Sequence, residues 1–237
     1  MDGQLDVHVV SQLEQKFEKT RFVRVDSDVI DKIIQKDDTA RVTLTNDQRD
    51  ALITVFDSQI PALDKTNFIV TFEQLAPTSN PVFVTQNEFM RRMKEMSALQ
   101  GGGGMMSFYG EMPDSYNLVV NTAHPVIEKL LADEEAACGL GIAPIAAELS
   151  EVKNKHDKLK DKHKGKKDEE IPTAEKAELE DLQKEIDKLT DNKKAVLKDF
   201  ATENKQVHQL IDLALLASNM LKGEALANFV KRSVELL

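Results

Sequence analysis

Apolar residues recur at helical spacing near the start of the chain, at Val7, Val10, Leu13 and Phe17. This spacing predicts an amphipathic helix over about 6–19. A short strand alternating around one polar position is expected at 22–25, and a second helix around 29–34. A helix, a strand and a helix cannot bury both faces of a sheet by themselves. We therefore predict that residues 1–40 are the closing part of an α/β domain.

The next block changes from helical to alternating periodicity. Thr45 with Gln48 three residues later forms a capping box, and Pro61 stands where the apolar face of the helix ends. Three later stretches alternate apolar and polar positions and are predicted to be strands: 68–72, 82–84 and 116–120. The sequence therefore predicts an α+β domain over 41–237, with a small three-stranded sheet and packed helices.

A methionine-rich helix is predicted after the second strand. Thr85 with Glu88 forms another capping box, and an apolar stripe at positions i, i+4 and i+7 follows. A run of four glycines at 101–104 separates this helix from a second apolar segment; a flexible linker explains that run better than a phosphate-binding loop does. Unbranched thioethers suit surfaces that accept varied partners, although an ordinary core stripe is the alternative. The predicted partner-binding residues are Phe89, Met90, Met93, Met96, Met105, Met106, Phe108 and Tyr109.

A charged region over 149–199 shows apolar positions that alternate spacings of three and four. This repeat predicts two helices paired as a coiled, protruding hairpin, with a turn near 165–172. Eight lysines lie between Lys153 and Lys167. They could meet an anionic partner, but the interleaved acidic residues favour a solvated helix face.

The last two predicted helices are strongly apolar, and Gly223 is the expected end of the first of them. Wide apolar stripes at the end of a chain suggest that a second copy covers them, which would give a two-fold four-helix bundle. Packing on the sheet of the same chain is the alternative. The predicted dimer residues are Leu210, Ile211, Ala214, Leu215, Leu221, Leu226, Phe229, Val230, Val234 and Leu237.

The overall charge limits the classes of partner. The net charge is −10, and no long basic stripe offers a footprint for phosphates, so no nucleic-acid partner is expected. The start of the chain lacks the basic and apolar pattern of a signal peptide. The apolar stretch at 210–221 is too short and too polar to span a membrane. We therefore predict a soluble, cytoplasmic protein without a membrane partner.

Few residues suggest reaction chemistry. Cys138 is the single cysteine, which excludes an intrachain disulfide and a multi-cysteine zinc site. Glu134 and Glu135 precede it, a setting that favours a buried small hydrophobe over a reactive thiol. His156 and His163 lie among lysines and make a poor metal site. Without a nucleophile–base pair or a phosphate loop, we predict no catalytic, cofactor-binding or metal-binding residue, and no enzymatic activity in this chain.

Several segments resemble a known family. Residues 88–94 resemble the exposed amphipathic helix of the ninety-kilodalton heat-shock chaperones. Residues 118–127 resemble the family's segment of a strand, Asn-Pro-x-His-Pro and a helix, with Thr122 where the family often has proline. Residues 212–217 followed by 229–232 resemble its dimerisation helices. Residues 6–25 look like the close of its middle domain. The order of these segments resembles the C-terminal part of a bacterial-type member.

The resemblance implies a function that the local patterns do not. Members of the family are V-shaped homodimers that bind unfolded or partly folded client proteins. Their N-terminal ATPase uses ATP and magnesium, but no nucleotide-binding motif is present in this chain, so no cofactor is expected here. The sequence ends at 235–237 without the acidic tail that tetratricopeptide co-chaperones bind, so such partners are not expected. The alternative function is a coiled-coil scaffold in which 149–199 recruits a specific protein.

Overall fold

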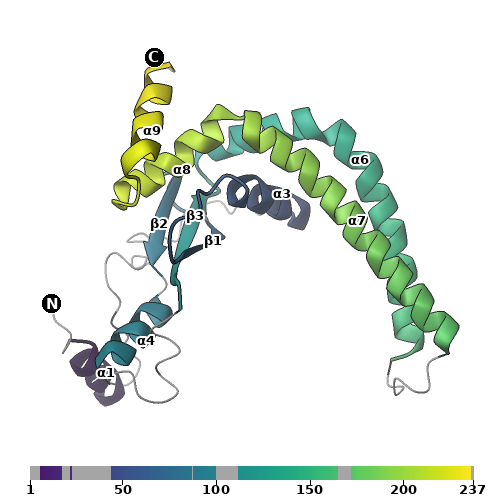
Figure 1. Cartoon of the computed structure of the whole chain (residues 1–237), viewed down its shortest axis with the longest axis horizontal. Helices are drawn as coiled ribbons and strands as arrows, with labels where there is room; N and C mark the ends of the chain where they lie inside the picture. Colours follow the sequence, from purple (N-terminus) through teal and green to yellow (C-terminus); the bar gives the residue numbers. More distant parts are fainter. Residues whose placement is uncertain are drawn as a thin grey trace. The chain divides into compact units, whose positions relative to one another are not determined.

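The computed structural model describes residues 6–17, 22, 44–86, 88–99, 112–164 and 172–235 (Figure 1). Compactness divides the chain into two units. The first unit comprises 1–45, 59–128 and 206–237, and the second comprises 46–58 and 129–205. The predicted domain boundary at residue 40 lies outside the described residues, as do the helix expected at 29–34 and all but the first residue of the strand expected at 22–25.

A mixed three-stranded sheet forms the centre of the first unit, as predicted. Its strands are β1 (Thr66–Glu73), β2 (Val82–Gln86) and β3 (Asp114–Asn121). The order is β1-β3-β2, with β3 parallel to β1 and antiparallel to β2. Three consecutive residues of β3, Leu118, Val119 and Val120, are buried. Both faces of this central strand are therefore covered, whereas β1 alternates between half-buried and exposed positions near its start.

Two of the helices of the first unit precede β3 in the chain. The helix expected at the start of the chain is α1 (Asp6–Lys16), and the methionine-rich helix is α4 (Glu88–Leu99). The capping box predicted for α4 is wrong. Thr85 is a buried residue of β2 and pairs with Asn117 of β3, so its backbone is extended and belongs to the sheet. A capping motif matched by sequence spacing cannot show that the strand continues through the first residue of the motif.

The C-terminal helices of the first unit are α8 (Lys205–Ala217) and α9 (Gly223–Glu235). The predicted end of the first helix at Gly223 is wrong. Asn219 has the left-handed conformation with φ of 56°, and the Met220 N–H donates to the Leu215 carbonyl at 2.8 Å. The Asn219 N–H donates to the Leu216 carbonyl at 3.0 Å. This Schellman motif ends α8, and Gly223 begins α9.

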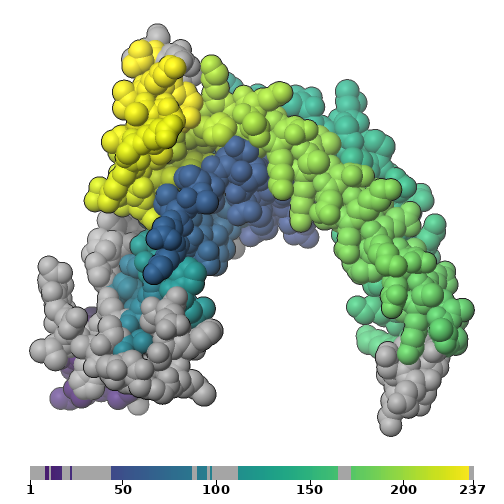
Figure 2. All heavy atoms as spheres, in the orientation of Figure 1, coloured from purple at the N-terminus to yellow at the C-terminus, as the bar shows by residue number. Residues whose placement is uncertain are grey.

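The second unit consists of helices. They are α3 (Asn46–Asp57), α6 (Pro125–Lys162), whose first residues belong to the first unit, and α7 (Thr173–Glu203). Helix α3 begins directly after Thr45, as expected, and contacts α7. Helices α6 and α7 run side by side, and Figure 2 shows α7 in green against α6 in teal. One apolar cluster joins them: Ile145, Leu149, Val152, Leu182, Ile186 and Leu189.

Helix α6 starts well before the region that the three-and-four repeat predicted. It is continuous from Pro125, through Gly139, Gly141 and Pro144, to Lys162. These residue types are unfavourable in a helix by intrinsic propensity. For this reason the repeat of apolar positions at spacings of three and four indicated a helix only from 145–149 onward. Within the described ranges, no helix combines the length and apolarity needed to cross a bilayer.

Candidate functional site

The described residues of the first unit form a groove beside α4. Its volume is about 230 Å³, below the roughly 300 to 1,000 Å³ of small-molecule sites, so it fits a protruding side chain rather than a cofactor. It lies between α4 and the start of β3. On its rim, the Lys94 ammonium pairs with the Asp114 carboxylate at 2.6 Å. The lining residues are Gln86, Met90, Arg91, Lys94, Pro113, Asp114 and Ser115.

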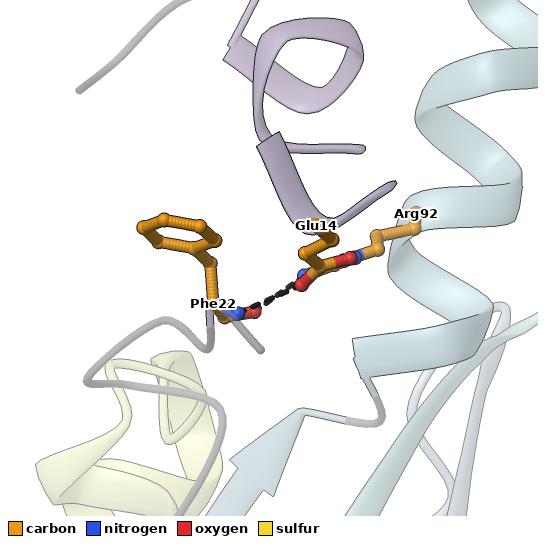
Figure 3. A network of polar contacts seen from close by, with 3 residues as sticks. All are labelled: Glu14, Phe22 and Arg92. Carbon is orange, nitrogen blue, oxygen red and sulfur yellow. Dashed lines mark hydrogen bonds and ion pairs between the residues drawn. The ribbon is translucent and has the colours of Figure 1, made fainter. Parts of the chain in front are cut away.

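A charged residue of α4, Arg92, contacts α1 and the segment that follows it (Figure 3). Its guanidinium donates to both oxygens of the Glu14 carboxylate, at 3.0 Å and 3.3 Å, and also to the Phe22 carbonyl. The Phe22 N–H donates to the same carboxylate at 2.7 Å. A two-pronged pair of this kind fixes orientation as well as distance. Arg92 therefore orients α4 while Met90 and Lys94 line the groove.

The groove contains one of the predicted partner-binding residues. Met90 is half-buried in its wall, whereas Met93 is half-buried but does not line it. The side chains of Phe89 and Met96 lie outside what the structure describes, and so do four further predicted residues, Met105, Met106, Phe108 and Tyr109. Sequence reasoning missed the polar lining, because the Lys94–Asp114 pair joins residues 20 positions apart and no local spacing indicates it.

The other end of β3 is fixed by a buried asparagine, Asn121. Its side-chain oxygen accepts from the Leu75 N–H at 3.1 Å and the Ala123 N–H at 3.2 Å. Its side-chain nitrogen donates to the Ala76 carbonyl at 3.0 Å. The His124 ring nitrogen Nδ1 then accepts from the Val126 N–H at 3.1 Å, which caps α6. This junction joins the ends of β1 and β3 to the start of α6.

The terminal helices divide into a buried face and an exposed face. Most of the predicted dimer residues are buried within the single chain: Leu210, Ile211, Ala214, Leu215, Leu221 and Phe229. Leu226 is half-buried, and Leu237 lies outside the described residues. The exposed apolar side chains are Leu213, Leu216, Val230 and Val234, which we call the α8–α9 surface. Sequence periodicity identified Val230 and Val234 but missed Leu213 and Leu216.

Two polar contacts hold α8 against α9. The Arg232 guanidinium pairs with the Asp212 carboxylate, and the Gln209 side-chain nitrogen donates to the Ser233 hydroxyl at 2.8 Å. On α8 the two residues lie about one turn apart, and on α9 they are consecutive. They fix the rotation of α9, so the four exposed apolar side chains keep a constant arrangement.

Cys138 and His163 make local contacts within the second unit. Cys138 is buried, as predicted, and burial followed by the Glu134 charge raises the pKa of its thiol. The His163 ring lies 2.6 Å from the Glu175 carboxylate, which also pairs with Lys162. In the part of the chain that the structure describes, no group of three histidine, cysteine or carboxylate side chains could hold a metal ion.

Glu134 gives a pH-dependent prediction. Burial, followed by the Glu135 charge, raises the pKa of this carboxyl, while Lys193 opposes the shift. The pKa of this carboxyl is therefore higher in the folded state than in the unfolded state. Its contribution to stability is fully present at pH values below its pKa in the unfolded state, and it is lost as the pH rises through its pKa in the folded state. The ionised group therefore destabilises at neutral pH. We expect Glu134→Gln to raise the melting temperature by about 2 °C at neutral pH and to have no effect below about pH 4.

Thermal unfolding followed by circular dichroism across this pH range measures the effect. Glu148→Gln, an exposed change in the middle of the same helix, is the control and should leave the melting temperature unchanged at every pH. An increase in the melting temperature of Glu134→Gln that persists at acidic pH would contradict the raised pKa of Glu134. The increase could then not come from removing a charge, because the carboxyl is already protonated at that pH.

Comparison with known proteins gives a consistent result. The chain is 55% identical over all 237 residues to the chaperone protein HtpG of Bacteroides thetaiotaomicron. It is likewise 55% identical to the HtpG of Bacteroides fragilis and 48% identical to that of Porphyromonas gingivalis, again over its full length. In each case the chain spans 34% of the length of the relative. No family model and no solved structure matches the chain.

Proposed function

Because this chain is homologous over its whole length to the C-terminal part of the HtpG chaperones, we propose that it holds client proteins and joins two chaperone protomers. The resemblance to the ninety-kilodalton heat-shock chaperones is thereby confirmed. Identity above one half over 237 residues is the observation that carries the proposal. The chain accounts for 34% of these relatives, so coupling to an ATPase that uses ATP and magnesium is proposed for the complete chaperone.

The proposed client surface is the groove beside α4 together with the methionines of that helix. Met90 offers an adaptable apolar wall, and Lys94 and Asp114 supply charge of both signs on the rim. A recess of about 230 Å³ suits a single protruding side chain of an unfolded polypeptide. Arg92 supports this role, because its contacts with Glu14 hold α4 in place while the groove stays open.

The proposed self-association surface is the α8–α9 surface. Two copies related by a two-fold axis would bring its exposed side chains together in a four-helix bundle. The buried residues of the same helices would then support the interface from within each chain. Dimerisation would also place two client grooves in one particle, which raises their effective concentration toward one client.

The scaffold alternative gains no support from the comparisons, in which each relative named above is a chaperone. In the described residues, α6 and α7 pack on each other through the apolar cluster that includes Leu149 and Ile186. We propose that these helices form a charged hairpin attached to the client-holding unit.

Replacing methionine at the groove tests client holding. We expect Met90→Ser together with Met93→Ser to weaken binding of a thermally unfolding client about tenfold, because burial of one apolar side chain contributes roughly 1.5 to 3 kcal/mol. Light scattering from the aggregating client is the measurement, and circular dichroism checks that the fold is retained. Ile69→Ser is the matched control, since Ile69 is an exposed apolar residue of β1 in the same unit. Equal losses in the variant and the control would contradict the proposal.

A further inference from the structure

The solvent-facing side of α6 carries an unusual apolar patch. Residues 136–147 contain no charged or polar side chain, in a chain of which 30% is charged. A helix that is apolar on every side is normally buried. Leu140 is nevertheless 92% exposed, more than any other large apolar side chain in the described residues. The exposed members, which we call the Leu140 patch, are Ala136, Ala137, Leu140, Ala143, Pro144 and Ala147.

Helix stability does not explain the composition of this segment. Gly139, Gly141 and Pro144 are the least favourable residue types for a helix interior. A Cβ at Gly139 would lie 4.0 Å from the Glu135 Cγ, and one at Gly141 would lie 3.9 Å from the Val196 Cγ1. Both distances are ordinary contacts, so alanine would fit at each glycine and would favour the helix. Local rules that are broken without a packing reason are typical of functional surfaces.

Carboxylates border the patch at both ends. Asp133 is exposed on the same side of the helix, N-terminal to the patch, and Glu148 and Glu151 are exposed C-terminal to it. An apolar centre between acidic ends matches a polypeptide segment with apolar side chains between basic ones. A second copy of this chain fits less well, because a two-fold pairing of the patch would bring carboxylate against carboxylate.

We propose that the Leu140 patch docks a polypeptide segment whose apolar side chains are flanked by lysine or arginine. This surface lies in the second unit and extends the proposed chaperone function, on which its biological purpose rests. Pro144 contributes directly, since it has no N–H to donate to the Leu140 carbonyl, and that carbonyl can accept from the backbone of the bound segment.

A labelled peptide with a leucine-rich centre and lysines at both ends tests the proposal by fluorescence anisotropy with the full chain. Leu140→Ser should weaken its binding about tenfold, whereas Leu140→Met should stay within about twofold of the parent. Glu148→Lys together with Glu151→Lys should weaken binding of the basic peptide. The same variant should strengthen binding of a matched peptide that carries glutamate in place of lysine. Lys158→Ser, an exposed polar change on the same helix, is the control and should have no effect.

Three outcomes would overturn the proposal: unchanged binding in Leu140→Ser, equal affinity for the basic and acidic peptides, or a dimer of this chain that Leu140→Ser dissociates in light scattering. Met90→Ser separates this surface from the α4 groove. If Met90→Ser no longer binds the basic peptide while Leu140→Ser still binds it, the Leu140 patch is excluded as the peptide site. The proposal that α4 holds clients then stands. If client protection depends on Leu140 and not on Met90, the assignment of α4 fails instead.

Discussion

Substituting aspartate for Val230 and Val234 should convert a dimer of this chain into monomers. Val230 is 52% exposed and Val234 is 65% exposed on α9, so neither change disturbs the core of a single chain. In a two-fold interface each substitution occurs twice, which buries four unpaired carboxylates and removes four valine contacts. We expect the dissociation constant to rise at least about a hundredfold. Light scattering over a range of concentrations measures this change directly.

A control variant that adds the same charge elsewhere on α9 distinguishes loss of the interface from general electrostatic repulsion between chains. Ala225 and Asn228 are exposed on the side of the helix opposite the two valines. Ala225→Asp with Asn228→Asp therefore adds the same number of carboxylates away from the α8–α9 surface, and this control should remain dimeric. If the parent chain is monomeric at tens of micromolar, or if both variants dissociate equally, self-association through this surface is wrong. Leu213→Ser and Leu216→Ser on α8 should reproduce the effect of the valine variant in weaker form.

Replacing Asn121 by leucine should cause a large loss of stability in the first unit. The amide of Asn121 satisfies the Leu75 N–H, the Ala123 N–H and the Ala76 carbonyl, and the residue is fully buried. Leucine has a similar size but no polar atom, so these backbone groups would lose their partner. Each unsatisfied buried group costs about 1 to 3 kcal/mol, and we expect a total loss of roughly 3 to 5 kcal/mol.

Urea unfolding followed by circular dichroism measures this loss. Asn67→Ala is the control, because Asn67 is exposed on β1 and its replacement should change the free energy of unfolding by less than about 0.5 kcal/mol. A loss below about 1 kcal/mol for Asn121→Leu would mean that the junction of β1, β3 and α6 is held by other contacts.

The local patterns of the sequence were sufficient for the elements whose signal lies within a few turns. The alternation at 68–72 and 116–120 identified β1 and β3, and helical spacing identified α1 and α9. Capping was less reliable. Thr85 satisfied a capping motif yet belongs to β2, and the turn after α8 uses Asn219 rather than Gly223. A motif of a few residues does not include the strand pairing or the hydrogen bonds that decide where a helix begins or ends.

The candidate sites depended more on the fold. Met90 could be named from the methionine stripe, but its neighbours in the groove come from the end of β2, from α4 and from the start of β3, which only the fold brings together. The Arg92–Glu14 pair joins residues 78 positions apart, and no spacing rule covers that separation. The apolar residues of α8 were recognisable as a set. Only the burial of Leu210 and the exposure of Leu213 showed which side is covered within one chain.

The sequence by itself determined the element types, the small sheet and the resemblance to a chaperone, because periodicity and motif order are properties of the chain alone. The tertiary structure decided the continuity of α6 through Gly139 and Pro144, since packing against α7 offsets the weak propensity of those residues. It also decided the exposure of Leu140 and Val234. Exposure depends on what every other element covers, and no local pattern contains that information.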